Sequence, residues 1–105
     1  MRRYIVRRYS PLDPELLILT SLASGPKHGY AIMADVESMT GLRIGPGTLY
    51  GAIPRLEQAG LVEALESTDR RRPYRLTGQG AEMLRTRLES MRSLSTAGLG
   101  RLGVT

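Results

Sequence analysis

The sequence predicts a mainly α-helical domain with a small β-hairpin, and three observations support this fold class. Apolar residues recur at helical spacing in four segments, each bounded by residues that cap or terminate helices. After Gly60 the pattern changes to two short runs typical of strands. The chain of 105 residues is long enough for one domain with its own core. It contains no cysteine, so disulfides and Cys-ligated zinc are excluded.

The charge balance favours a nucleic-acid partner. Fifteen basic residues against ten acidic ones give a net charge of +5 and a pI near 10.2. All but one of the basic residues are arginine, which pairs with phosphate through two parallel hydrogen bonds and also contacts guanine edges. A genomic preference for arginine codons is the alternative explanation. No segment has the ~20 apolar residues that cross a bilayer, so we expect no membrane partner, and the lack of cysteine fits a cytoplasmic location.

Residues 1–12 form a predicted basic N-terminal arm, in which four arginines are interleaved with Tyr4 and Tyr9. The arm could lie along phosphates, cover a dimer core or simply fray, and the sequence leaves all three open. The first helix follows, capped by Asp13 and ended by Gly25-Pro26. It is apolar nearly all round, so we expect one face to meet the core and another to meet a partner subunit through Leu16 and Leu19.

A second helix is predicted from Gly29 to Met39, closed by Gly41. The residues expected to face inward are Tyr30, Ile32, Met33 and Val36. The single histidine, His28, precedes this helix, where an imidazole more often caps or packs than catalyses or binds a metal. We expect no metal site. Lys27 and His28 are nevertheless candidate DNA-binding residues.

The third predicted helix occupies the stretch from Gly45 to Gly60. Gly45 serves as N-cap, Pro46 suits the first helical position, and Gly60 suits the left-handed position after the last turn. One side carries the apolar set Leu49, Ala52, Ile53 and Leu56. The opposite side offers small or hydrogen-bonding residues and one arginine, namely Gly47, Thr48, Tyr50, Gly51, Pro54, Arg55 and Gln58. A solvated helix would carry Lys and Glu there, so this face is suited to close approach by another surface.

Residues 61–66 and 73–76 are predicted strands, and the loop between them ends in Arg70, Arg71 and Arg72. We therefore predict that residues 13–77 form a winged helix-turn-helix DNA-binding domain whose third helix enters the major groove. The three arginines would lie over phosphates or enter a narrow minor groove, with a solvated hairpin as the alternative.

A last helix is predicted over residues 78–95, capped by Thr77. Leu84, Leu88 and Met91 recur within it at heptad-like spacing, which predicts a C-terminal dimerisation helix. The alternative is that this stripe folds back onto its own domain. Residues 96–105 contain three glycines and little apolar content, so we expect a disordered tail.

Three blocks of the sequence resemble the PadR family of bacterial winged-helix transcriptional regulators. They are His28-Gly29-Tyr30, then Pro46-Gly47-Thr48-Leu49-Tyr50 with its continuation to Val62, and Tyr74-Arg75-Leu76-Thr77 with Gly80. The resemblance extends from about Leu16 to Leu88, and the spacing of the blocks is more specific than any block alone. Gly45, Pro54 and Gly78 depart from the family pattern, and Pro54 removes the hydrogen bond to the Tyr50 carbonyl inside the third helix.

The resemblance implies a homodimeric repressor of the short type, with a single dimerising helix, that binds inverted-repeat operators in double-stranded DNA. In several members a small hydrophobic or aromatic effector loosens DNA binding. It also implies that Pro46, Gly47, Thr48 and Tyr50 meet the groove, that Arg55 contacts phosphate, and that Arg70 to Arg72 lie on the wing. The alternative function is a winged-helix protein-interaction module without specific DNA binding. We expect no enzyme and no cofactor, because no nucleophile and base pair is evident.

Overall fold

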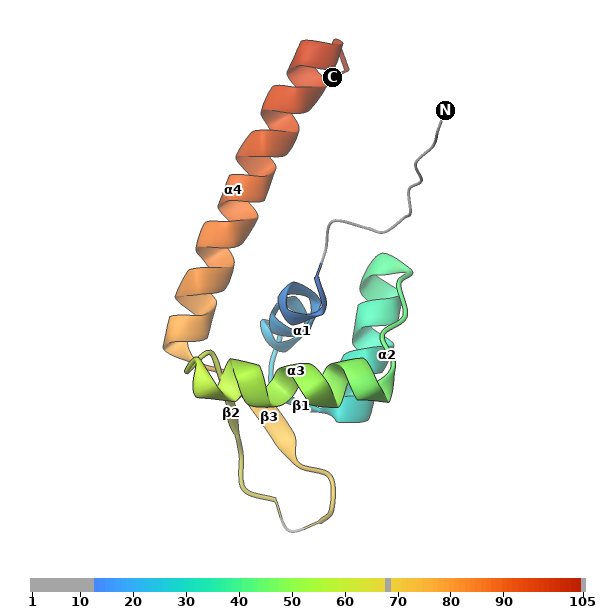
Figure 1. Cartoon of the computed structure of the whole chain (residues 1–105), viewed down its shortest axis with the longest axis vertical. Coiled ribbons are helices and arrows are strands. Elements are labelled where there is room, and N and C mark those ends of the chain that lie inside the picture. The colour runs from blue at the N-terminus through green and yellow to red at the C-terminus, as the bar shows by residue number, and fades with distance from the viewer. Residues whose placement is uncertain (1–12, 68, 105) are drawn as a thin grey trace.

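The computed structural model describes residues 13–67 and 69–104. It confirms a mainly helical fold with a small antiparallel sheet (Figure 1). The elements follow one another as α1 (Pro14–Leu22), β1 (Lys27–His28), α2 (Gly29–Thr40), α3 (Pro46–Gln58), β2 (Val62–Ala64), β3 (Pro73–Leu76) and α4 (Gly78–Leu102). The predicted basic arm and its alternatives lie outside the described residues.

The sheet has three strands where the sequence predicted two. Its order is β1-β3-β2, with Val62 opposite Leu76 and Lys27 opposite Tyr74. A strand of two residues shows no alternation, so β1 leaves no pattern in the sequence. Its pairing with β3 matters for the site, because it fastens the wing, which consists of β2, β3 and the connection between them, to the start of α2.

Helix α1 lies at the centre of the core rather than at an edge. The elements α2, α3, α4 and β3 all pack against it, and Figure 1 shows it between α4 and α2. Leu16 is 2% exposed and Leu19 is 1% exposed. The prediction that these two leucines face a partner subunit is therefore wrong, because their own chain covers α1 on every apolar side.

Most of the predicted helix ends are confirmed. Asp13 accepts a hydrogen bond from the Leu16 amide at 2.7 Å, and Thr77 accepts one from the Gly80 amide at 2.9 Å. Gly41 and Gly60 both adopt the left-handed conformation that ends a helix. The inward orientation predicted for Tyr30 is wrong, since this residue is 71% exposed. It lies two positions before the buried Ile32, which places it on the opposite side of α2.

Helix α4 is longer than predicted. It continues through residues 96–102 and ends at Gly103 in the left-handed conformation, so the expectation of a disordered tail is wrong for those residues. Leu84 is 4% exposed and packs in the core, so the alternative that the stripe folds back on its own domain holds at this position. Met91 is partly buried and Leu88 is exposed. Beyond them α4 extends past the rest of the molecule (Figure 1).

Candidate nucleic-acid interface

Helix α3 has the two faces that the sequence predicts. Its apolar side is buried, and its other side is exposed along the whole helix. A Cβ atom built at Gly47 or Gly51 meets no atom within 4 Å. Glycine costs about 1 kcal/mol relative to alanine inside a helix, and packing of the described chain does not require it at these positions. Because glycine has no side chain, a second surface can come close to the backbone on this face.

Pro54 does not interrupt α3, which continues to Gln58. The proline ring is exposed, so it clashes with no neighbouring element. It lacks an N–H, and the Tyr50 carbonyl on the exposed face therefore loses its helical partner. This carbonyl lies beside residues that the sequence assigns to DNA.

Arg55 is engaged within the chain. Its Nε donates to Glu15 Oε2 at 2.8 Å, and its Nη1 donates to the Gly51 carbonyl at 2.9 Å. The guanidinium group thus ties α3 to the first turn of α1. A phosphate at this position, as the family resemblance implies, would compete with Glu15.

Lys27 is directed to α1 rather than to α3. Its ammonium group donates to the Ser21 carbonyl and to Ser24 Oγ, and it lies 3.9 Å from an Asp35 carboxylate oxygen. The last carbonyls of a helix attract a cation, so this contact closes α1. The structure therefore does not bring the Lys27 charge to the exposed face of α3.

His28 is the N-cap of α2, as predicted. Its Nδ1 accepts a hydrogen bond from the Ala31 amide at 3.4 Å. A neutral imidazole that accepts at Nδ1 carries its proton on Nε2, so the second ring nitrogen is left as a donor.

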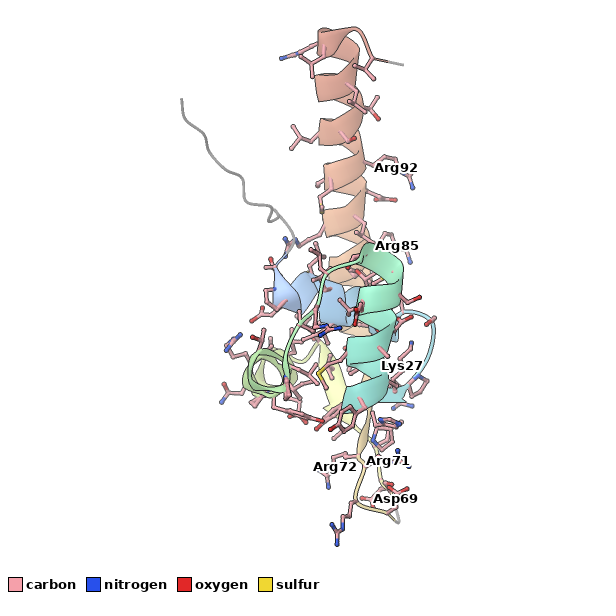
Figure 2. All side chains as sticks on the ribbon, turned by 90° about the vertical axis from the view of Figure 1, so that its right-hand side faces the viewer. Lys27, Asp69, Arg71, Arg72, Arg85 and Arg92 are labelled. Atoms are coloured by element: carbon pink, nitrogen blue, oxygen red, sulfur yellow. The ribbon has the colours of Figure 1, made fainter. Side chains whose placement is uncertain are left out.

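The wing carries its arginines outward. Asp69 Oδ1 accepts hydrogen bonds from the Arg71 amide at 2.8 Å and from Ser67 Oγ at 3.1 Å, which fixes the turn. Figure 2 shows Arg71 and Arg72 on the wing, at the end of the molecule opposite the C-terminus of α4. Among residues 13–67 and 69–104, Arg70, Arg71 and Arg72 form no ion pair.

Four arginines outside the wing loop differ from the wing arginines because they form ion pairs. The ion pairs Arg43–Glu37, Arg55–Glu15, Arg75–Glu63 and Arg87–Asp13 each neutralise one arginine. Exposed pairs of this kind stabilise a fold by only a few tenths of a kcal/mol to about 1 kcal/mol. Among the described residues, Arg85, Arg92 and Arg101 of α4 and the three wing arginines have no such partner, and the wing arginines are the three that lie next to one another in the chain.

A cavity of about 190 Å³ lies between the wing, α3 and the start of α2. Its lining combines residues from all three blocks of the sequence motif with the three wing arginines, namely His28, Gly29, Tyr30, Tyr50, Tyr74, Arg70, Arg71 and Arg72. Burial raises the pKa of the Tyr74 phenol above its usual value, Glu57 and Tyr50 raise it further, and Arg72 opposes them. Tyr74 therefore remains a neutral donor at physiological pH.

Sequence reasoning missed Gly29, Tyr30 and Tyr74 as members of this cavity. Tyr74 joins it because β1 pairs with β3, which sets Lys27 opposite Tyr74. For Gly29 and Tyr30 the available signal was that they follow the predicted contact His28 in the same motif block, and for Tyr74 it was that it begins the third block. Over the described ranges, no group of three or more His, Cys, Asp and Glu residues could hold a metal ion. Within those ranges, no helix has both the length and the apolar character needed to cross a membrane.

The chain matches the family model described as the transcriptional regulator PadR-like family over residues 18–86. It is 51% identical over 83 residues to a 37.1 kDa protein in transposon Tn4556 of Streptomyces fradiae. That match covers 79% of this chain and 24% of the relative, so the chain spans about a quarter of its length.

Several solved structures are similar, including the following two. A PadR family transcriptional regulator from Eggerthella lenta has 31% identity and a TM-score of 0.67, over 84% of this chain and 79% of its own. A PadR family transcription regulator from Clostridium difficile has 24% identity and a TM-score of 0.74, over 84% and 95%, and supports the fold alone. The family model covers most of the domain that carries the motif and the wing, and the chain therefore belongs to the PadR-like family of transcriptional regulators.

Proposed function

We propose that the protein is a homodimeric, cytoplasmic repressor that binds an inverted-repeat operator in double-stranded DNA. The observation that carries this proposal is the pairing of two features at one end of the molecule. The exposed face of α3 carries glycines that leave its backbone accessible, and it is rich in hydrogen-bonding groups. Beside it, the wing presents three arginines that no described carboxylate neutralises.

In the proposed complex the first turns of α3 enter the major groove. Pro46, Gly47 and Gly51 allow close approach, and Thr48 offers a hydroxyl and a methyl group to base edges. Arg70, Arg71 and Arg72 contact phosphates or enter the adjacent minor groove. The two recognition helices of a dimer would lie about 34 Å apart, one turn of the duplex.

The dimer is proposed to form through the second half of α4. Leu94, Leu99 and Leu102 are exposed there, Leu88 is exposed just before it, and Met91 is partly buried. At about 2 kcal/mol for each large side chain, burying three on each of two subunits gives on the order of 10 kcal/mol before the costs of association. That amount is sufficient for a stable dimer.

A small hydrophobic or aromatic effector is part of the proposal. A groove of about 380 Å³ beside α4 has apolar walls from Ala81, Leu84 and Leu88. Arg85 and Arg92 also line it, and they project from the same side of α4 (Figure 2). A ligand in this groove would touch the helix that is proposed to join the subunits, and could thereby change the spacing of the recognition helices.

The test is a titration of the protein against its own upstream intergenic DNA and a scrambled duplex of equal length, at two salt concentrations. We expect a preference of ~1000-fold or more for the native duplex. Thr48→Ala should reduce this preference, whereas Arg71→Ala should weaken both duplexes alike and lower the salt slope by about one. Equal losses on both duplexes for both variants would contradict this division of roles.

The alternative function, a protein-interaction module, predicts weak and equal binding to both duplexes. The three wing arginines favour phosphate over this alternative, because like charges that lie together are stabilised best by an anionic partner. Equal and steeply salt-dependent binding in the titration would therefore turn the search toward distant operators or a protein partner.

A further inference from the structure

The hydroxyl of Tyr50 lies directly on the α-carbon of Gly29. A Cβ atom built at Gly29 would be 2.0 Å from the Tyr50 hydroxyl oxygen and 2.7 Å from its ring carbon Cζ. No real Cβ atom comes so close to another heavy atom. Tyr50 is nevertheless 49% exposed, so the core does not fix its ring. The absence of a side chain at Gly29 is therefore what permits the observed position of the Tyr50 phenol.

This position brings Tyr50 into the cavity between α3 and the wing, where the polar groups are mainly donors. His28 uses Nδ1 to cap α2 and has Nε2–H left to donate. Tyr50, Tyr74, Arg70, Arg71 and Arg72 line the same space, and their side chains supply hydroxyl and guanidinium donors. No Asp or Glu of the described ranges is part of the lining. A cavity whose lining is rich in donors and cations and contains no carboxylate is suited to bind an oxyanion.

The oxyanion that the proposed function brings to this place is a phosphate of the DNA backbone. An aromatic hydroxyl serves a phosphate oxygen well, since tyrosine is among the side chains that donate to phosphates in protein–DNA complexes. A base edge suits Tyr50 less, because its hydroxyl lies against Gly29 at the start of α2. Thr48 lies in the first turn of α3, is exposed, and is free to meet base edges.

We propose that the cavity lined by Tyr50, His28 and the wing arginines holds one backbone phosphate of the bound duplex, and that Gly29 is the positioning residue that keeps the Tyr50 hydroxyl in it. The inference rests on the proposed function and deepens it. It assigns Tyr50 to phosphate contact, where the family resemblance alone implies only that Tyr50 meets the groove.

The first experiment compares Tyr50→Phe, Thr48→Ala and Arg72→Ala on the operator and on a scrambled duplex at two salt concentrations. Tyr50→Phe removes one neutral donor, so both affinities should fall about three- to tenfold, with their ratio and the salt slope unchanged. Arg72→Ala should weaken both duplexes and lower the slope by about one. Thr48→Ala should lower the ratio about tenfold or more. A Tyr50→Phe variant that loses affinity for the operator alone, or for neither duplex, would overturn the phosphate assignment.

The second experiment tests Gly29. Gly29→Ala should displace the Tyr50 ring and cause the same uniform loss of affinity as Tyr50→Phe. In a Tyr50→Ala background, where no ring is left to displace, Gly29→Ala should change affinity less than about twofold. Gly78→Ala is the matched control: Gly78 is likewise the first residue of a helix, and a Cβ there meets nothing within 4 Å. Additive losses in the double variant, or no loss in Gly29→Ala, would overturn the positioning role.

Folding is controlled separately. Leu49 Cδ2 lies 3.1 Å from the built Cβ at Gly29, so a modest fall in the unfolding temperature is expected and affinities are measured well below it. The Tyr50 ring resonances of Gly29→Ala should shift while those of Gly78→Ala do not. Unshifted resonances in Gly29→Ala would contradict the contact itself.

A third experiment identifies the phosphate. Operators that carry one uncharged methylphosphonate linkage at a time are titrated with the wild type and with Tyr50→Phe. At one linkage in each half-site, the methylphosphonate should lower the affinity of the wild type. The same linkage should lower the affinity of Tyr50→Phe by no more than about twofold, because the contact is already lost. Fully additive losses at every linkage would overturn the proposal. If the wild type prefers neither duplex, the proposed function fails, while the effect of Tyr50→Phe on the scrambled duplex still tests the phosphate site.

Discussion

The two halves of α4 share one apolar pattern but have different surroundings. In the first half, Leu84 is enclosed by the core and Gly80 is buried. In the second half, Leu94, Leu99 and Leu102 are exposed on a helix that extends beyond the body (Figure 1). Apolar spacing along a helix thus indicates that a face will be covered. It does not indicate whether the cover comes from the same chain.

The glycines of α4 differ in the same way. A Cβ at Gly80 would lie 2.1 Å from the Leu61 carbonyl oxygen, a backbone atom that cannot move aside. At Gly98 and Gly100 it would meet nothing within 4 Å. The same residue type is therefore required for close packing in the first half of the helix, whereas within the described chain it only weakens the second half.

The largest effect is expected from Leu84→Ala. Because Leu84 packs in the core, its truncation should lower the free energy of unfolding by about 2–5 kcal/mol. Leu94→Ala, at an exposed position ten residues later, should change it by less than about 0.5 kcal/mol when both variants are unfolded at concentrations below the dissociation constant of the proposed dimer. Urea unfolding of both variants measures the difference. Similar losses would mean that both halves of α4 are covered equally.

The next effect concerns association. The double substitution Leu99→Glu and Leu102→Glu should raise the dissociation constant of the proposed dimer at least ~100-fold, or about 2.7 kcal/mol, because it places charge on the apolar side of the exposed half. Analytical ultracentrifugation measures this change, with Ser93→Glu, at an exposed position on the other side of the helix, as control. An unchanged dimer would show that another surface joins the subunits.

A smaller loss of stability is expected from Gly80→Ala. The added methyl group must push α4 away from the Leu61 carbonyl, which should cost about 1–3 kcal/mol. Gly78→Ala, two residues earlier with open space around its Cβ, is the matched control. Equal unfolding free energies for the two variants would contradict the close approach at Gly80.

The smallest effect should be a gain. Gly100→Ala replaces an unneeded glycine in the second half of α4 and should stabilise the helix by about 0.5–1 kcal/mol, measured as a higher unfolding temperature. Gly100 lies on the side of the helix away from Leu84 and Leu102, so the dissociation constant of the dimer should not change. Gly98 lies on the apolar side, so Gly98→Ala should change the dissociation constant. A weaker dimer in Gly100→Ala would show that the interface includes the side of the helix that carries Gly100.

Local features were predictable where neighbouring residues decide them. The buried face of α3, the caps Asp13 and Thr77, and the left-handed glycines Gly41 and Gly60 all follow from spacing and side-chain chemistry. The strand β1 was not predictable, because two residues show no alternation. The length of α4 was missed because glycines 98 and 100 resemble linker composition, although the helix continues through both.

The sequence by itself determined the helices, their caps, the two faces of α3 and the family to which the chain belongs. Only the tertiary structure decided which charges remain uncompensated. Arg55 pairs with Glu15 across 40 residues, and Arg87 contacts Asp13 across 74. It also decided that Leu16 and Leu19 are covered by their own chain and that Gly29 supports the Tyr50 hydroxyl. These outcomes depend on distances between residues far apart in the chain, which residue spacing does not encode.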